Sequence, residues 1–209
     1  MGKEVIYEGP DLSKHNGNVN IQAIRDAGYG RIALRIGYGK NHADQKYDAN
    51  AQACANLGVK VLLYWFSYAY NVEMAQNEAK FACDHAGKYW SRCPIAYDFE
   101  GDSIKFAQKE GVTVTKDLST RMAIAFLSEV KSRGYIPVLY TNKNDMQHYF
   151  DLGRIQAEVG DVRIWYARYT ANLSPAELEL ADIWQYTDKG KIPGVPVNVD
   201  VNKFYTELD

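Results

Sequence analysis

The stretch PIAYDFE, residues 94–100, decides the fold prediction for this chain. Its β-branched and aromatic residues are typical of a short strand, on which successive side chains point to opposite faces. The larger apolar side chains share one face, which suits packing under helices: Ile95, Tyr97 and Phe99. Asp98 and Glu100 share the other face, and two adjacent carboxyl groups repel each other when both are charged. One of them should therefore keep its proton to higher pH, as a general acid does, although an acidic strand end can also simply meet solvent or cap a helix.

Outward from this stretch, strands and helices alternate. The sequence predicts strands at 5–12, 31–38, 59–68, 94–100 and 136–141. Apolar residues near helical spacing, often with a glycine just beyond, predict helices at 21–27, 49–57, 72–85 and 116–133. Residues 143–158 are predicted to be irregularly helical, and the segment between 100 and 116 to be a loop between a strand and a helix.

The rhythm changes after residue 160, where three strands are predicted with little helix between them, at 162–169, 182–187 and 197–201. Five strand–helix units followed by three strands favour parallel pairing with the helices outside. The predicted fold is therefore α/β, an irregular TIM-like barrel with few outer helices in its last third. An open doubly wound sheet is the alternative, but the glycine-rich phosphate loop expected after its first strand is missing. Because no linker or low-complexity tract marks a boundary, residues 1–209 are predicted to form a single domain.

Composition excludes several classes of protein. The net charge is −2 and no cluster of Lys or Arg stands out, so no nucleic-acid partner is expected. No apolar run is long enough to span a bilayer, and residues 1–5 lack the apolar region of a secretory signal, so the chain is made in a cytoplasm or has lost a leader. The three cysteines and four histidines are scattered, so no metal or other cofactor is expected: Cys54, Cys83, Cys93, His15, His42, His85 and His148.

In a barrel of this type, the site is built at the carboxyl ends of the strands. Acidic residues belong to the first, fourth and eighth predicted strands: Asp11, Asp98 with Glu100, and Asp200. Other strand ends supply a cation, an amide and aromatic rings: Arg35, Tyr38, Tyr64, Phe66, Tyr140, Trp165, Trp184 and Gln185. A single ring is more often a packing residue, and Arg35 could equally neutralise a carboxyl. Four carboxyls at the same end of the barrel are harder to explain by packing or by charge neutralisation. Clustered like charges lower stability unless a site uses them.

Carboxyl pairs combined with aromatic rings suit polysaccharides. A sugar offers an apolar face to a ring and a rim of hydroxyls to acids and amides. Cleaving a glycosidic bond needs a protonated carboxyl at the leaving oxygen and a second group that meets the positive charge of the oxocarbenium-like transition state.

In this order along the chain, the motifs resemble those of the glycoside hydrolase family 25 muramidases. These are the Chalaropsis-type lysozymes, common among phage endolysins and bacterial autolysins. The matching residues are Asp11-Leu12-Ser13 with Asn16-Gly17, Arg35, Tyr64 with Phe66, Asp98-Phe99-Glu100, Tyr140-Thr141, Trp165 with Ala167, Trp184-Gln185-Tyr186, and Gly194 followed by Asp200 and Asn202. Many relatives carry Gln where this chain has Asn16, a difference that leaves the acids untouched.

The resemblance implies a flattened barrel and hydrolysis of the β-1,4 bond between N-acetylmuramic acid and N-acetylglucosamine in bacterial peptidoglycan. By motif, Glu100 would be the general acid and then the base, and Asp98, Asp11 and Asp200 would form an acidic floor. Two acids at i and i+2 also resemble chitinases in which the N-acetyl group of the substrate attacks, so retention by that route is favoured over direct attack by an aspartate. Action on the cell wall, a phage origin, and a wall-binding domain that is separate or lost would all fit the resemblance.

Two other functions remain open at this point. A metal-dependent polysaccharide deacetylase could use a similar barrel, although it needs histidine ligands that are not grouped here. A non-catalytic glycan-binding module would need the aromatic residues but not the acids.

Overall fold

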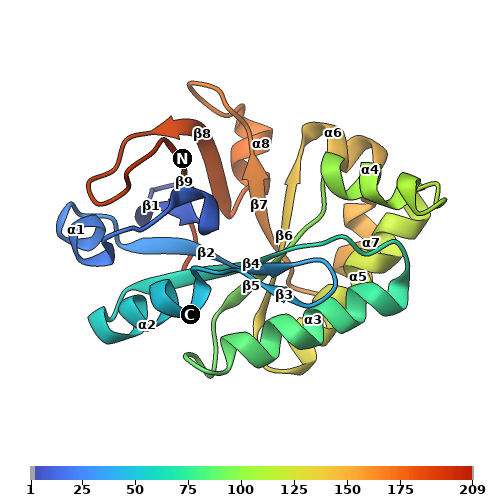
Figure 1. The fold of residues 1–209 in the computed structure, drawn as a ribbon. Coiled ribbons are helices and arrows are strands. Elements are labelled where there is room, and N and C mark those ends of the chain that lie inside the picture. The colour runs from blue at the N-terminus through green and yellow to red at the C-terminus, as the bar shows by residue number, and fades with distance from the viewer. Residues whose placement is uncertain (1–2, 209) are drawn as a thin grey trace.

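The computed structural model describes residues 3–208, so Met1 and Gly2, part of the segment searched for a leader, lie outside it with Asp209. Within this range eight strands close into a barrel (Figure 1), as the sequence predicted. They are β1 (Tyr7–Leu12), β2 (Arg31–Tyr38), β4 (Lys60–Phe66), β5 (Pro94–Asp98), β6 (Ile136–Asn142), β7 (Arg163–Ala167), β8 (Ile183–Gly190) and β9 (Val199–Phe204). The short β3 (His42–Ala43) pairs with the end of β2, and pairing of β1 with β2 completes the closure.

Strand β9 differs from the others in direction. The remaining barrel strands run parallel to one another, whereas β9 is antiparallel to both β8 and β1. The connection from β8 to β9 contains no helix, and a strand that returns through a short loop runs antiparallel to the one before it. Parallel pairing was expected from the alternation of elements, and that expectation is wrong for β9. The beginning of β9 therefore lies at the barrel end where the other strands finish.

The helices pack outside the barrel. Their bounds are α1 (Ile21–Asp26), α2 (Tyr47–Leu57), α3 (Val72–Ala86), α4 (Gly101–Lys109), α5 (Lys116–Ser132), α6 (Lys143–His148), α7 (Leu152–Val159) and α8 (Pro175–Leu180), with a short 3₁₀ helix at Lys14–Asn16. One sequence prediction needs correction: α4 occupies most of the segment predicted as a loop. The short α8 stands between the sixth and seventh predicted strands, where little helix was expected. In the last third, α8 has only six residues, so the outer layer is thin there as expected.

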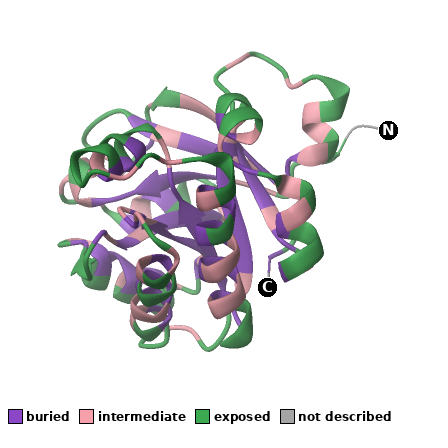
Figure 2. Ribbon diagram, turned by 90° about the vertical axis from the view of Figure 1, so that its right-hand side faces the viewer, coloured by how far each residue is buried: buried purple, intermediate pink, exposed green. Residues whose placement is uncertain are grey.

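The barrel separates two apolar cores, and its strands are buried over most of their length (Figure 2). The inner core fills the barrel with residues such as Ala96, Val138 and Trp165. The outer core lies between strands and helices and contains Ile95, Tyr97 and Phe99, together with the three buried cysteines. The alternation read from residues 94–100 therefore separates the two cores, and it aims Asp98 to the inner side.

Glycine at position 9 allows the first two strands to close the barrel. A Cβ atom there would stand 1.6 Å from the carbonyl oxygen of Arg31 on β2, a distance that no side chain permits. Because β1 carries Asp11 two residues later, this close approach also fixes where that acid stands at the mouth.

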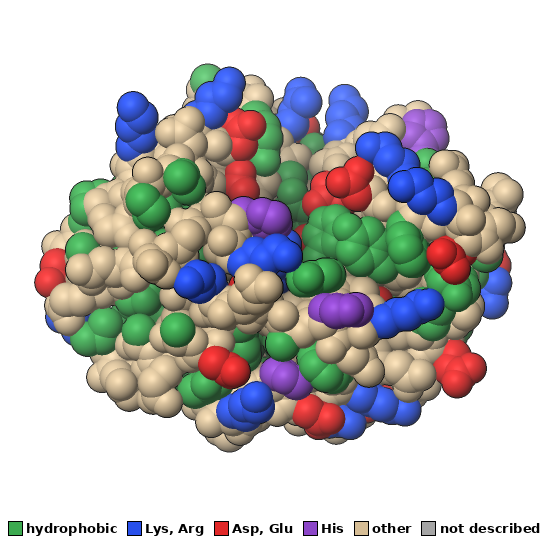
Figure 3. Space-filling model, viewed as in Figure 1, with side chains coloured by type: hydrophobic (Ala, Val, Ile, Leu, Met, Phe, Trp, Pro, Cys, Tyr) green, Lys and Arg blue, Asp and Glu red, His purple; other side chains and the backbone are tan. Residues whose placement is uncertain are grey.

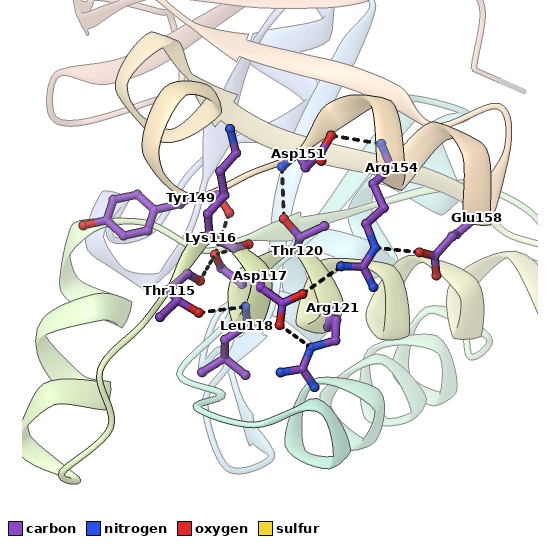
Figure 4. A network of polar contacts seen from close by, with 11 residues as sticks. Thr115, Lys116, Asp117, Leu118, Thr120, Arg121, Tyr149, Asp151, Arg154 and Glu158 are labelled. Carbon is purple, nitrogen blue, oxygen red and sulfur yellow. Dashed lines mark hydrogen bonds and ion pairs between the residues drawn. The ribbon is translucent and has the colours of Figure 1, made fainter.

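Polar contacts join the start of α5 to α7 (Figure 4). Asp117 accepts hydrogen bonds from Arg121, at 2.9 Å, and from Arg154 on α7, at 2.8 Å. The Asp151 amide donates to the Thr120 hydroxyl at 3.0 Å. These ion pairs are solvent-exposed, so each contributes little to stability.

Candidate active site

A pocket of about 410 Å³ opens at the barrel mouth. Its walls include acidic, aromatic and amide side chains from most strands of the barrel. Ten of the sequence-predicted site residues line it: Asp11, Arg35, Tyr64, Phe66, Asp98, Glu100, Tyr140, Trp165, Gln185 and Asp200. In the space-filling view, a cleft opens in the upper middle of the molecule with acidic and hydrophobic side chains on its walls (Figure 3).

Asp98 and Glu100 form the central carboxyl pair. Asp98 ends β5, and Glu100 keeps an extended backbone (φ −140°, ψ −162°) as the N-cap of α4, so both side chains point to the mouth. The two carboxyl groups interact, so that each affects the pKa of the other. Burial, together with the neighbouring charges of Glu100 and Asp11, raises the pKa of Asp98 well above its usual range. Burial and the charge of Asp145 raise the pKa of Glu100 to about 7. The pair therefore holds a proton at neutral pH.

The first and last strands supply the other two acids. Gly9 lies opposite Asn202 and Pro10 opposite Val201, and continuing this register brings Asp11 beside Asp200. Burial raises the pKa of both carboxyls, and the charge of Asp11 contributes to a pKa of about 7 for Asp200. Asp11 and Asp200 are 189 positions apart in the sequence, and only closure of the barrel brings them together.

Buried amides hold Asp11 in place. Its Oδ2 atom accepts hydrogen bonds from Gln185, at 3.0 Å, and from Asn202, at 3.1 Å. The Gln185 amide oxygen in turn accepts from the hydroxyls of Tyr140, at 3.0 Å, and Tyr169, at 2.9 Å. Such a linked network fixes the orientation of the carboxylate, because every buried polar group that takes part has a defined partner.

Arg35 is paired with an acid that the sequence did not single out. Its guanidinium contacts Asp44 Oδ2, with Nε at 2.8 Å and Nη2 at 2.7 Å. Asp44 is buried, and it also accepts from the backbone N–H groups of Lys14 and Lys46. Arg35 thereby presents a fixed positive charge to the pocket, which partly offsets the effect of burial on the pKa values of Asp11 and Asp98.

Comparisons with known proteins identify the family. The family described as "Glycosyl hydrolases family 25" matches residues 10–195. The chain belongs to this family. The match spans the strands that carry most of the pocket, and it confirms the resemblance recognised in the sequence motifs.

Known relatives of this family 25 glycoside hydrolase are lysozymes. Lysozyme M1 of Streptomyces globisporus is 24% identical over 94% of this chain and 67% of its own length. The autolytic lysozyme of Clostridium acetobutylicum is 21% identical over 94% of this chain and 55% of its own length. The solved structure of the modular autolysin LytC from Streptococcus pneumoniae, in complex with a synthetic peptidoglycan ligand, superposes with a TM-score of 0.77 at 23% identity, over 95% of this chain and 46% of that one. The family 25 chain thus spans from about half to two thirds of the length of these relatives.

Two residues predicted for the site lie outside the pocket. Trp184 points to the other side of β8 from Gln185, where its indole N–H donates to the Arg168 carbonyl at 2.7 Å and the Lys203 ammonium lies 5.2 Å from its ring. Tyr38 lies beyond Arg35, stacked on His42 with ring centroids 5.5 Å apart. The geometry therefore gives Trp184 a packing role, whereas Tyr38 lies next to a pocket residue.

Several pocket residues were not predicted to be part of the site, among them His15, Tyr169, Asp188 and Val197. Tyr169 could have been found, because it ends the predicted strand 162–169. Asp188 lies just beyond the predicted strand 182–187, and Val197 is the first residue of the predicted strand 197–201. Neither was expected in the pocket, because the path from β8 to β9 depends on the antiparallel return of β9. Ser13 and Asn16, quoted above only as motif residues, also line the pocket.

Metal binding and membrane crossing are two further properties on which the structure bears. Among residues 3–208, no three His, Cys, Asp or Glu side chains are grouped so that they could hold a metal ion. Within the same range, no helix combines the length and the apolar character needed to cross a bilayer. The family membership, rather than the absence of such a metal site, decides against the deacetylase alternative.

Proposed function

We propose that this family 25 hydrolase is an N-acetylmuramidase that acts on bacterial cell walls. Its substrate would be the β-1,4 bond between N-acetylmuramic acid and N-acetylglucosamine in peptidoglycan, and residues 1–209 would form one catalytic domain. The observation that carries the proposal is the pair of neighbouring carboxyls, Asp98 and Glu100, within a pocket walled by aromatic rings. The lysozyme relatives and the peptidoglycan ligand bound to a structural neighbour support the choice of substrate.

Glu100 is the general acid in this proposal. Its pKa of about 7 keeps a large fraction of the carboxyl protonated near neutral pH. In the first step the proton passes to the glycosidic oxygen while the bond between that oxygen and C1 breaks. In the second step the carboxylate of Glu100 takes a proton from water, which restores the acid, and the water oxygen bonds to C1 in place of the group that attacked in the first step.

The N-acetyl group of the substrate is the internal nucleophile in the proposed route. Its carbonyl oxygen attacks C1 as the leaving sugar departs. Water then attacks C1 from the opposite side and the bond between C1 and that carbonyl oxygen breaks, which restores the N-acetyl group and gives net retention. Asp98 supports this route, because a carboxyl that touches Glu100 leaves no room for a sugar between the two, as direct attack would need. Asp98 Oδ1 has no hydrogen-bond partner among residues 3–208, so it could accept the N–H of the acetamido group. Asp11 and Asp200 would meet the positive charge that develops on the sugar.

Replacing Glu100 with Gln tests the assignment. Glu100→Gln should abolish the clearing of a peptidoglycan suspension, with a loss of at least about 10³-fold in kcat, because the amide cannot donate the proton. The protein should still sediment with cell walls. The matched control is Glu110→Gln, which makes the same change at an exposed position just past α4 and should clear the suspension normally.

Product analysis tests the bond that is cut. Mass spectrometry of the released fragments after borohydride reduction should find N-acetylmuramitol at the reduced end. Reduced N-acetylglucosamine would indicate a glucosaminidase instead. Full activity of Glu100→Gln would remove the acid assignment, and binding without any hydrolysis by the unmodified protein would favour the non-catalytic glycan-binding module.

A further inference from the structure

A row of aromatic rings leads away from the catalytic pocket. Phe66 lines the pocket and packs on Tyr68, with ring centroids 5.1 Å apart. Phe106, on α4, lies 5.0 Å from Tyr68 and 6.4 Å from Tyr70. All four side chains are half-buried, so each ring is partly open to solvent. We call these four residues the aromatic track. Figure 3 shows hydrophobic side chains gathered on this face of the molecule beside the cleft.

The aromatic track ends at a second pocket. Tyr70 forms part of this pocket, which has a volume of about 430 Å³ and lies at the amino end of α3. The other lining residues include three amides, two carboxyls and a cation: Asn41, Asn71, Asn77, Glu73, Glu78 and Lys40. The track therefore connects the catalytic pocket to a polar hollow that the proposed mechanism does not use.

A buried carboxyl fixes the backbone that carries the track. Glu78, on α3, accepts a hydrogen bond from the Ser67 hydroxyl at 2.5 Å and another from the Tyr68 N–H at 3.1 Å. The Ser67 N–H in turn donates to the carbonyl oxygen of Asp98 at 2.8 Å. The Tyr68 ring also lies against Gly39, where an added Cβ atom would stand 3.0 Å from the Tyr68 ring. The track is therefore pre-organised relative to the carboxyl pair, as a binding surface requires.

We propose that the aromatic track binds further sugars of the same glycan strand, so that a strand cut at Glu100 continues over Phe66, Tyr68 and Phe106 towards the second pocket. This inference rests on the proposed function and adds a binding surface to it. Successive rings held in a row suit a linear polymer with a repeated apolar face, in the way that rows of rings stack the bases of single-stranded nucleic acids. The amides of the second pocket suit the hydroxyl and N-acetyl groups of a sugar at the end of the track.

The test compares short and long substrates. Phe106→Ala and Tyr70→Ala remove rings that do not line the catalytic pocket. The substrates are a peptide-free tetrasaccharide and peptide-free long glycan strands prepared from peptidoglycan. For each variant, the ratio of kcat/KM on long strands to kcat/KM on the tetrasaccharide should fall about tenfold, mainly through KM. Phe106→Tyr, which keeps the ring, should restore the ratio. Tyr205→Ala, a half-buried tyrosine just after β9 at the other end of the barrel, is the matched control and should leave the ratio unchanged.

Equal losses on both substrates, or no loss on either, would overturn the proposal. A loss confined to strands that still carry stem peptides would assign the track to the peptide and would also overturn it. Dissociation constants for long peptide-free strands, measured in a Glu100→Gln background, give a readout that does not depend on hydrolysis. If the unmodified protein cleaves neither substrate, the proposed function fails, whereas a tenfold weaker dissociation constant for Phe106→Ala would still support the track.

Discussion

At the scale of single residues, the acids of the pocket differ in what their neighbours supply. Asp11 receives two amide donors, whereas Asp98 and Glu100 have each other as the neighbouring carboxyl. Alternation along residues 94–100 was enough to predict that Asp98 and Glu100 would lie together. It could not reveal Asp145, whose buried carboxylate at the start of α6 raises the pKa of Glu100, because no periodic pattern links α6 to β5.

Removing the charge of Asp145 should shift the pH profile. Burial raises the pKa of Glu100, and the charge of Asp145 raises it further, so Asp145→Asn should lower it. Since the acid must be protonated, activity falls as pH rises through the pKa of Glu100. The alkaline limb of kcat/KM should therefore move to lower pH by roughly 0.5–1 unit, a size expected for one partly screened charge. Clearing rates between pH 5 and 9 measure this shift.

The exposed carboxyl of Asp161 gives a matched control. Asp161→Asn removes an acid from the turn before β7, and it should leave the profile in place. An alkaline limb that stays fixed in Asp145→Asn, or moves to higher pH, would show that Glu100 is not the group whose proton is lost.

At the scale of elements, α4 orients the acid. Glu100 is its N-cap residue, and the Glu100 N–H donates to the hydroxyl of the fully buried Ser103 at 3.2 Å. This helix was predicted as a loop, because the segment has a length typical of a connection between a strand and a helix. The spacing of Glu100 and Ser103, three residues apart, was the signal that could have found it, since polar residues at this spacing mark helix starts. The direction of β9 left no comparable local signal, because it depends on how the barrel closes.

Ser103→Ala should separate orientation of the acid from its chemistry. Loss of the hydroxyl leaves the Glu100 N–H without its side-chain acceptor, so the free energy of unfolding should fall by about 1 kcal/mol. The Glu100 carboxyl should become less well oriented, and kcat should fall several-fold with little change in KM. Urea unfolding and initial rates measure the two effects. Ser132→Ala, at an exposed position in the last turn of α5, is the control and should change neither. An unchanged kcat would show that α4 does not position the acid.

At the scale of the whole molecule, the site depends on joining the two ends of the chain. β9 lies between β1 and β8, so an acid from residue 11 and one from residue 200 reach the same pocket. Counting five strand–helix units and three strands predicted a barrel, and with it the convergence of these acids. The count could not predict how the interior is joined, because the buried amide of Asn202 on β9 contacts two strands that are distant in the sequence, β1 and β7.

Asn202→Ala should therefore weaken the fold and the site together. The Asn202 side chain accepts from the Trp165 indole N–H at 2.8 Å, and it donates to the Gly9 carbonyl at 3.2 Å and to Asp11 Oδ2 at 3.1 Å. Alanine would leave these buried groups without that partner, so the free energy of unfolding should fall by about 2–3 kcal/mol. Because Asp11 loses one of its two amide donors, kcat should fall about tenfold among the molecules that remain folded.

Asn56→Ala, on the exposed side of α2, provides the control for urea unfolding and for initial rates. Equal urea midpoints for the two variants would mean that closure rests on backbone pairing alone, whereas a stability loss with normal kcat would mean that Gln185 suffices to hold Asp11.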